Sequence, residues 1–517
     1  MKIRHLGVRC ALCALIVLTL LALGCGSGPG DNYPNPETSI AATQNSLVAQ
    51  YNVTLPRIEG RVWVEFGRDT SYGKQTSVTA ATTGFGQTVS ILVAGMQPNT
   101  TYHMRAHVDW YPGLSWVDQD QTFTTGALPN QASATGGGPL VLPRLTVTRP
   151  GPSLEPSPGV ELINVLSPGN SNFLGTLVTD LSGNIIWYYD AIATPIRLTM
   201  DGHFLLGLSY LLREIDLAGN TIREVSVGSV NQWLQQKGYT FTVTNFHHDV
   251  ILLPNGHWIA LANATRDFTD LPGYPGTTSV LGDVLIDIDP NDNVAWAWST
   301  FDHLDVNRHP MGLPDWTHSN AIVYTPNDSN LLLSVRAQSW ILKIDYENGA
   351  GTGNILWRLG NEGDFALSGG DPSQWFYAQH FPSPVSINGS QMTLAVFDDG
   401  NLRVLDDNGD LCGRPGNEPC YSRATIFQID ESLKTASLDW QFLPVLYTFW
   451  GGSINQLANG DVEFDMSQPF TQDPLSSVVM EVSQTDNPSV VWQMNIQGGN
   501  AYRAYRIPSL YPGVTWQ

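Results

Sequence analysis

The chain has 517 residues, of which 25 are Lys or Arg and 47 are Asp or Glu, so its formal net charge is −22 at pH 7. This charge argues against binding driven by counterion release from nucleic acid and favours a small partner. Only 14% of the residues are charged, whereas 49 are Gly, 33 are Pro and 16 are Trp, which predicts two or more units of short strands and turns rather than long helices.

The first residues have the pattern of an export signal. A basic start is followed by an apolar run over residues 10–23 and a glycine-rich end, so residues 1–24 are predicted to be a signal peptide. Residues 21–25 resemble a bacterial lipobox, in which Cys25 would be lipidated and would anchor the protein in the cell envelope, on the periplasmic side. Because Ala22 stands where that pattern prefers leucine, an ordinary cleaved signal peptide is the alternative. A retained anchor is a third reading, but the apolar run is short for a membrane span.

A tether and a β-rich unit follow. Residues 25–45 are rich in Gly, Pro, Asn and Ser, which is typical of a flexible tether. Over residues 46–126 apolar and polar side chains alternate between regularly spaced turns, a pattern typical of a β-sandwich. The stretch 96–102, Met-Gln-Pro-Asn-Thr-Thr-Tyr, resembles the corner motif of fibronectin type III domains. We therefore interpret this segment as a small fibronectin type III-like domain, joined to the rest by a linker over residues 127–157.

The remaining segment, residues 158–517, repeats a two-part pattern. One part is a turn followed by an apolar strand, as in residues 254–260, and the other is a strand, a polar turn and a strand that usually ends in tryptophan, as in residues 180–187. Six recurrences of this β-only unit predict a six-bladed β-propeller, so the fold class is all-β. The innermost strand of each blade would line a central channel.

Three of these repeats begin a strand with histidine. The residues are His247 or His248 in Phe-His-His-Asp, His318 in Thr-His-Ser-Asn, and His380 in Gln-His-Phe-Pro. Because equivalent positions in different blades converge on the axis, we expect three histidines to face one cavity. Arg336 ends the strand that His318 and Asn320 begin, which places it in the same channel. The alternative is a repeated polar residue without a chemical role, although unpaired histidines in a channel would lower stability by desolvation.

Histidines and an arginine that converge in an acidic protein suit a tetrahedral oxyanion, sulfate or phosphate. Cationic and hydrogen-bonding groups from several directions stabilise such a group in its transition state. A neutral imidazole is also a nucleophile near neutral pH, so one histidine could accept the transferred group while another handles protons. The sequence contains no Gly-x-x-x-x-Gly-Lys-Ser/Thr phosphate loop, in keeping with a reaction that uses no nucleotide donor.

Five fragments stand in a fixed order along this segment. They are Phe-His-His-Asp-Val at 246–250, Asp-Trp-Thr-His-Ser-Asn at 315–320, Ser-Val-Arg-Ala-Gln-Ser at 334–339, Trp-Arg-Leu-Gly at 357–360, and Gln-His at 379–380 with Phe-Asp-Asp-Gly-Asn at 397–401. Together they resemble the bacterial aryl sulfate sulfotransferases, over about residue 158 to the C-terminus. The resemblance implies an exported six-bladed propeller enzyme that needs no 3′-phosphoadenosine-phosphosulfate. It also implies ping-pong transfer of a sulfuryl group from a phenolic sulfate to a phenol.

The same resemblance assigns roles to the channel residues. His380 matches the nucleophile, which would form a sulfohistidine, and His318, Asn320 and Arg336 match the groups that bind the sulfate and stabilise its charge. A further catalytic histidine is His247 or His248, and alignment of the repeats slightly favours His247. The family also uses a hydroxyl of the last blade, for which Thr448 and Ser453 both qualify and neither is assigned. Small aryl sulfates and phenols are the expected partners, with no cofactor and no metal.

Cys412 and Cys420 flank a turn-rich loop, residues 413–419, that can bring two thiols together. An exported compartment would let them oxidise, so we predict one structural disulfide. A metal site is the weaker alternative, because zinc sites usually show a second close pair of ligands.

Two other functions stay open at this point. One is a propeller hydrolase whose converging His, Asn and Asp side chains hold a divalent metal, and a chelator would inactivate it. The other is a non-catalytic binding lipoprotein of the cell envelope, which the presence of all five fragments argues against. The sequence predicts no oligomeric state.

Overall fold

The computed structural model describes residues 34–56, 60–81, 86–110, 113–129, 142–150, 154–166, 175–190, 196–469 and 475–516. The predicted signal peptide and Cys25 lie outside the described residues, as do much of the tether and of the linker. Strands dominate the described part, which has one α-helix, α1 (Val227–Gln236), and four short 3₁₀ segments at Thr300–Asp302, Arg336–Gln338, Glu347–Gly349 and Pro372–Gln374. The all-β class is thus confirmed. No helix among these residues is long and apolar enough to cross a membrane.

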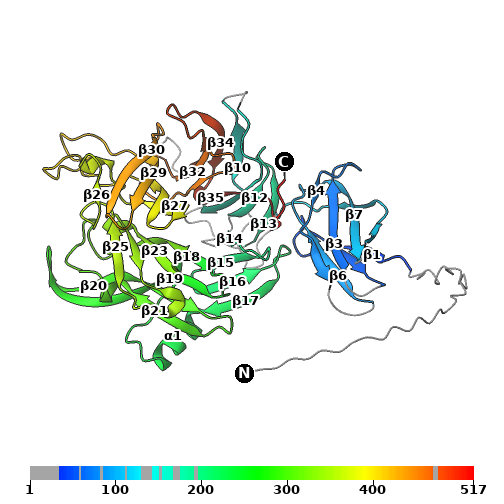
Figure 1. The fold of residues 1–517 in the computed structure, drawn as a ribbon, viewed down its shortest axis with the longest axis horizontal. Coiled ribbons are helices and arrows are strands. Elements are labelled where there is room, and N and C mark those ends of the chain that lie inside the picture. Colours follow the sequence, from blue (N-terminus) through cyan, green and yellow to red (C-terminus); the bar gives the residue numbers. More distant parts are fainter. Residues whose placement is uncertain are drawn as a thin grey trace, which may run out of the picture.

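The N-terminal unit, drawn in blue in Figure 1, consists of two antiparallel sheets. One sheet has the order β1 (Glu37–Ala42), β2 (Ala49–Thr54), β6 (Thr88–Val93). The other has the order β4 (Lys74–Gln75), β3 (Gly60–Gly67), β7 (Thr101–Trp110), β8 (Leu114–Val117), with β5 (Thr79–Ala81) beside β3 and β9 (Gln121–Thr124) beside β7. Alternate side chains of β7, from Tyr102 to Val108, are buried in the core that the two sheets share. The Tyr102 hydroxyl accepts a hydrogen bond from the Gln97 amide (3.0 Å) and so fixes the turn before β7.

Residues 144–507 form six further sheets among the described residues. The first has the order β13 (Ile185–Tyr189), β12 (Thr176–Thr179), β11 (Val160–Leu166), β35 (Asn500–Ile507), and the second the order β14 (Ile196–Leu198), β15 (Phe204–Leu208), β16 (Leu211–Ile215), β17 (Thr221–Ser226). The third is β18 (Phe246–Leu252), β19 (Trp258–Leu271), β20 (Tyr274–Ile288), β21 (Val294–Ser299), and the fourth β22 (Ser319–Thr325), β23 (Asn330–Val335), β24 (Trp340–Ile344), β25 (Ile355–Leu359). The fifth is β27 (His380–Asn388), β28 (Gln391–Asp398), β29 (Arg423–Asp430), β30 (Thr435–Phe442), and the sixth β31 (Ile454–Gln456), β32 (Val462–Ser467), β33 (Ser476–Val482), β34 (Val490–Gln497). β26 (Ala366–Leu367) extends the fifth sheet beside β30, and β10 (Arg144–Thr148) extends the sixth beside β34.

These six sheets follow one another around a centre, from teal through green and yellow to red in Figure 1. The first strands of four consecutive sheets, β18, β22, β27 and β31, contact one another in turn. Every residue of β23 and β24 is buried, because each sheet packs on a neighbour through both of its faces and the apolar core lies between adjacent sheets. The last strand, β35, pairs with β11 and completes the first sheet. The fold is therefore propeller-like.

The repeated tryptophan joins four of the six sheets to the next one. Trp187 donates its indole N–H to the Leu217 carbonyl (2.7 Å), Trp298 to that of Gly353 (2.8 Å), Trp440 to that of Thr485 (3.2 Å), and Trp492 to that of Leu181 (2.9 Å). Each acceptor lies in a turn of the following sheet, and the last bond returns from the sixth sheet to the first. A buried indole N–H usually has a partner, so in these four sheets the tryptophan both fills the core and links neighbouring sheets. Trp357 of the fourth sheet fills the core, but its indole N–H has no hydrogen-bond partner among the described residues.

After β35 the chain crosses to the N-terminal unit, and the C-terminus lies between the two units in Figure 1. Leu510, Tyr511, Val514 and Trp516 are buried in the core of that unit. The Tyr511 hydroxyl donates to the Leu92 carbonyl (2.8 Å) and accepts from the Ala94 amide (2.7 Å), while the Trp516 indole donates to the Gln75 carbonyl (3.2 Å). The C-terminal residues thus complete the N-terminal core, although they follow the propeller-like segment in the chain.

Candidate active site

The predicted histidines stand where three inner strands begin, and each strand has a bulge there. The pairing register shifts between Phe246 and Val250 in β18, between Ser319 and Ala321 in β22, and between His380 and Ser383 in β27. Such bulges redirect side chains beside active sites. His248 and His318 also have positive φ angles, 54° and 46°, an uncommon conformation for residues with a Cβ that persists where the surroundings hold it.

The bulges bring side chains from distant repeats into one cluster. The His248 ring lies 4.7 Å from the His318 ring and 5.5 Å from the Tyr502 ring, centroid to centroid. His380 lies 6.2 Å from the same Tyr502 ring. Histidines of the third, fourth and fifth sheets therefore meet around a tyrosine of β35, which belongs to the first sheet. We call His248, His318, His380 and Tyr502 the histidine cluster.

His248, and not His247, faces His318 in this cluster. The Nδ1 atoms of His247 and His248 are 2.7 Å apart, a hydrogen bond in which one ring donates and the other accepts. His247 Nε2 lies 3.3 Å from Asp283 Oδ1. Burial lowers the pKa of His248 well below its ordinary value of 6.5, and the charges of His318, His247 and His380 lower it further. His248 is thus neutral, and His247 orients it.

His380 is buried, and both of its ring nitrogens have a partner. Nδ1 lies 2.5 Å from Asp399 Oδ2, and the Gly451 amide donates to Nε2 over 3.2 Å. Because Nε2 accepts a hydrogen bond, the ring proton must be on Nδ1, which donates to Asp399. The unprotonated nitrogen, the one that can act as a nucleophile, is therefore Nε2.

Burial pushes both members of this pair toward their neutral forms. It lowers the pKa of His380 well below 6.5, and Arg336, His318 and Arg503 lower it further. Burial also raises the pKa of Asp399 well above its ordinary value, against the opposing charge of Arg336. His380 is therefore an unprotonated imidazole, which can form a bond through Nε2.

Asn320 and Arg336 lie beside this histidine. Asn320 donates its amide to the carbonyl of Gln379, the residue before His380 (2.8 Å), and Arg336 Nη2 donates to the Phe449 carbonyl (2.9 Å). Among the described residues, Asn320 Oδ1, Arg336 Nε and Asp399 Oδ1 are buried without a hydrogen-bond partner. Buried polar atoms are nearly always paired, so unpaired ones beside a nucleophile indicate a place for a polar ligand.

A buried ion cluster holds the inner strands together next to these residues. Asp249 accepts from Arg197 Nε and Nη2 (3.0 and 2.8 Å) and lies 3.2 Å from Arg503 Nη1. Burial alone would raise the pKa of Asp249, but the charges of Arg197 and Arg503 outweigh burial and hold it below 3.8. Arg503 also donates to the Asn320 carbonyl, and the Ile322 amide donates to Asp249 (2.8 Å). We call Asp249, Arg197 and Arg503 the central ion cluster.

The two hydroxyl candidates are both engaged in other bonds. The Thr448 hydroxyl lies within hydrogen-bond distance of the carbonyls of Trp450 (3.1 Å) and Ser467, and the Ser453 hydroxyl of Asp465 (2.5 Å) and the Ala504 carbonyl (2.7 Å). Both hold the segment that carries Gly451 to its neighbours. The geometry therefore shows both hydroxyls supporting the segment of the Gly451 amide, which binds His380. It identifies neither of them as a group that binds substrate.

The predicted disulfide is present between Cys412 and Cys420. Cys412 packs against the Gly400 carbonyl, so the disulfide loop adjoins the segment of Asp399. Among the described residues, the one group of His and carboxylate side chains close enough to share a metal ion is Asp201, His203 and Glu214, which does not include the histidine cluster.

Sequence reasoning did not single out Asp399, Gly451, Tyr502 or the central ion cluster. Asp399 did carry a signal, because it lies in the Phe-Asp-Asp-Gly-Asn fragment. Tyr502 and Arg503 carried none, since their strand has no histidine and no turn pattern that marks it as an inner strand.

Comparison with known proteins gives one family match. The model of the family described as "Arylsulfotransferase (ASST)" matches residues 159–506. No curated protein matches the chain.

Several solved structures align with it weakly. They include a protein of unknown function from Bacteroides caccae (10% identity, 56% of this chain and 94% of that chain, TM-score 0.24) and a europium-containing methanol dehydrogenase (11%, 78% and 77%, 0.32). A variant of Synechocystis apocarotenoid oxygenase aligns with 10% identity, 88% of this chain and 81% of that chain, and a TM-score of 0.29. At these TM-scores the structures say nothing about function.

Proposed function

The chain belongs to the arylsulfotransferase family and is an aryl-sulfate sulfotransferase, and we propose that it works by a ping-pong mechanism through a sulfohistidine at His380. The observation that carries this proposal is the environment of His380. Its Nδ1 is bound to Asp399, its Nε2 is unprotonated, and burial, Arg336 and His318 lower its pKa. The substrates are aryl sulfates and phenols.

We also propose the finer architecture. The six sheets of residues 158–517 are the blades of a six-bladed propeller, which the Trp492 to Leu181 bond and the β35 to β11 pairing support. The N-terminal unit is a fibronectin type III-like domain, supported by its two sheets and by the bond from Gln97 to Tyr102. A lipid on Cys25 and a periplasmic location complete the proposal.

In the first half-reaction His380 Nε2 exchanges its hydrogen bond from the Gly451 amide for a bond to the sulfur, which its lone pair forms, and the bond from sulfur to the aryl oxygen breaks. The electron pair of that bond leaves with the phenolate. The oxygens of the sulfuryl group gain stabilisation from the Arg336 guanidinium, from His318 and from the Asn320 side chain. Asp399 stabilises the positive charge that develops on the His380 ring through its bond to Nδ1.

In the second half-reaction a phenol oxygen attacks the sulfur, and the bond from sulfur to Nε2 breaks. The phenol proton must leave the oxygen as this bond forms. His248 is neutral and lies against His318, so one of this pair takes the proton while His247 holds the ring of His248 in place. The nitrogen recovers its lone pair, and the histidine that took the proton releases it to water, which returns the enzyme to its starting state.

Brief exposure of the protein to 4-nitrophenyl sulfate should leave one +SO3 adduct on the peptide that contains His380. The adduct forms because transfer to Nε2 precedes transfer to the acceptor, and added phenol should remove it. Mass spectrometry of digests that are kept out of acid reports the adduct, with the His380→Asn variant as the control. Full turnover by His380→Asn, with no adduct in the unchanged protein, would exclude the sulfohistidine.

The rate of adduct formation should change little between about pH 7.5 and pH 5.5. The pKa of His380 lies well below 6.5, so Nε2 stays unprotonated across this range, and 4-nitrophenolate leaves without needing a proton. An imidazole with an ordinary pKa would lose roughly tenfold in its reactive fraction over the same range. Quenched-flow measurement of the adduct at each pH tests this, and a loss with a midpoint near pH 6.5 would contradict it.

A further inference from the structure

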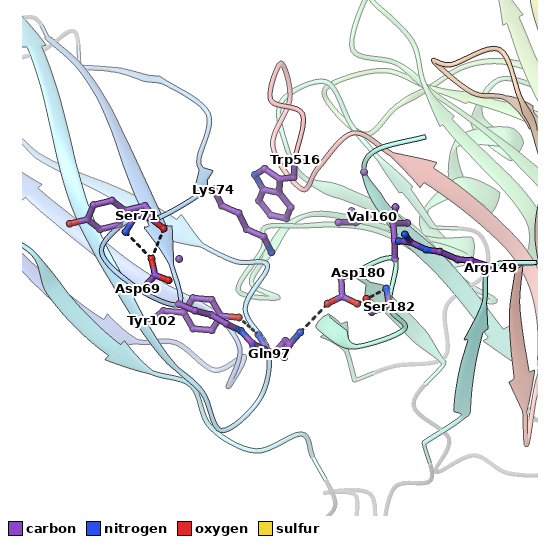
Figure 2. A pocket seen from close by; sticks show the side chains of 16 residues that line it. Asp69, Ser71, Lys74, Gln97, Tyr102, Arg149, Val160, Asp180, Ser182 and Trp516 are labelled. Carbon is purple, nitrogen blue, oxygen red and sulfur yellow. Dashed lines mark hydrogen bonds between the residues drawn. The ribbon is translucent and has the colours of Figure 1, made fainter. Parts of the chain in front are cut away.

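A cleft of about 520 Å³ lies between the N-terminal unit and the first sheet of the propeller-like segment. Figure 2 shows its side chains, which include none of the histidine cluster. Arg68, Asp69 and Lys74 approach from the N-terminal unit, Arg149 and Asp180 come from the other side, and Trp516 of the C-terminal tail forms part of the wall. Clefts of roughly 300–1,000 Å³ at domain interfaces are common places for small ligands.

Lys74 is the side chain that most needs a partner in this cleft. Its ammonium donates to the Gly95 carbonyl (2.9 Å) and lies 4.6 Å from the centroid of the Trp516 ring. Among the described residues, no carboxylate forms an ion pair with it. Burial lowers its pKa to about 8, with Asp180 opposing this effect and Arg68 adding to it. A half-buried ammonium without a counter-ion costs stability, and an anion in the cleft would offset that cost.

The two carboxylates of the cleft are already satisfied by hydrogen bonds. Asp180 Oδ1 accepts from the Ser182 amide (3.0 Å), and its Oδ2 accepts from Gln97 Nε2 (2.9 Å). Asp69 accepts from the amide and hydroxyl of Ser71, which lower its pKa. These carboxylates therefore stabilise their own turns and the bridge between the two units. Arg149 lies 3.8 Å from the exposed carboxylate of Glu155, so Lys74 and Arg68 are the cationic side chains left to recognise a ligand.

We propose that this interdomain cleft binds a small organic anion, whose carboxylate, sulfate or phosphate group pairs with Lys74 and Arg68. Arg68 donates to the Gln97 side chain, which in turn donates to Asp180 across the interface. An anion seated there contacts both units, so it also stabilises their docking. The cleft volume exceeds what an inorganic oxyanion needs, which is why the ligand has an organic body. The distribution of positive charge supports an anionic ligand, because the whole chain has only 25 Lys and Arg residues and three of them line this cleft.

Reductive methylation of the full chain tests the proposal at a single residue. Lys74 should be methylated readily near pH 8, and sodium benzoate at ten times its Kd should slow this reaction about tenfold. Benzoate carries no sulfuryl group, so the result does not depend on the proposed transfer reaction. Peptide mass spectrometry measures the rates, with the exposed Lys237 as the internal control. Phenyl phosphate and phenyl sulfate should also protect Lys74, whereas the neutral benzyl alcohol should not.

Three results would overturn the proposal: no protection by any of these anions, equal protection by benzyl alcohol, or protection by inorganic sulfate as strong as by benzoate. The variants Lys74→Met and Lys237→Met give a second measurement by calorimetry. Lys74→Met should lose benzoate binding and keep sulfuryl transfer, and Lys237→Met should keep both. If Lys74→Met does not fold, the methylation experiment on the unchanged chain decides alone.

Discussion

Replacement of Asp399 by asparagine is expected to lower kcat/KM for sulfuryl transfer by about three to four orders of magnitude. The Asp399 carboxyl accepts the proton of His380 Nδ1 (2.5 Å) and is completely buried. An asparagine amide can instead donate to Nδ1, which favours the tautomer with the proton on Nε2. That tautomer has no lone pair on the nitrogen that must bond to sulfur. Lost stabilisation of the charged sulfohistidine adds to the effect.

The loss should fall on kcat and on adduct formation, with little change in substrate affinity. Arg336 and Asn320 hold the sulfate in this proposal, and neither is bonded to Asp399 in the described residues. Single-turnover measurement of the +SO3 adduct separates this positioning role from a general loss of structure. Thermal unfolding of the same variant checks that it folds.

The matched control is Asp315→Asn. Asp315 forms the same kind of bond to His318 Nδ1 (2.5 Å), but this pair is partly exposed, so water can replace the lost partner. Its loss in kcat/KM should be at most about tenfold. Equal losses in the two variants would show that Asp399 does not set the tautomer of His380.

The repeats in the sequence predicted which residues meet, because a propeller-like fold converts equal places in a repeat into neighbours in space. His318 and His380 stand at equivalent places, and four of the recurring tryptophans, Trp298 among them, link consecutive sheets. The same logic slightly favoured His247, whereas it is His248 that faces His318. A bulge shifts the register of β18 between Phe246 and Val250, and a shift of one residue turns a side chain to the opposite face.

The rest of the site depends on contacts between distant parts of the chain. Tyr502 and Arg503 reach the cluster because β35 pairs with β11, more than 300 residues earlier in the chain. Their segment has no local feature that indicates this closure. Trp516 likewise reaches the core of the N-terminal unit through a contact between distant parts of the chain. Local patterns describe strands and turns, but a contact across the whole chain depends on how the ring of sheets closes.

Replacement of Asp249 by asparagine is expected to lower the free energy of unfolding by about 3–5 kcal/mol. Asp249 is the one carboxylate of the central ion cluster, and its partners Arg197 and Arg503 carry two positive charges. Arg503 is almost fully buried, so the substitution leaves its guanidinium without a counter-ion in a place that water does not reach. Removal of one partner of a buried ion pair costs far more than the pair contributes, because the remaining charge stays desolvated.

Urea denaturation of the full chain measures this loss, and Asp302→Asn is the control. Asp302 pairs with Arg266 at the surface (2.8 Å), where both side chains are about half exposed, so its loss should cost roughly 0–1 kcal/mol.

A second substitution gives a sharper test. The double variant Asp249→Asn/Arg197→Met should be less destabilised than the sum of its two single variants, since it removes one of the unpaired cations. Strict additivity would show that the charges of this cluster do not act together.

The cluster also supports the site, because Arg503 donates to the Asn320 carbonyl and the Ile322 amide donates to Asp249. Sulfuryl transfer by Asp249→Asn should therefore fall even at temperatures where the variant remains folded.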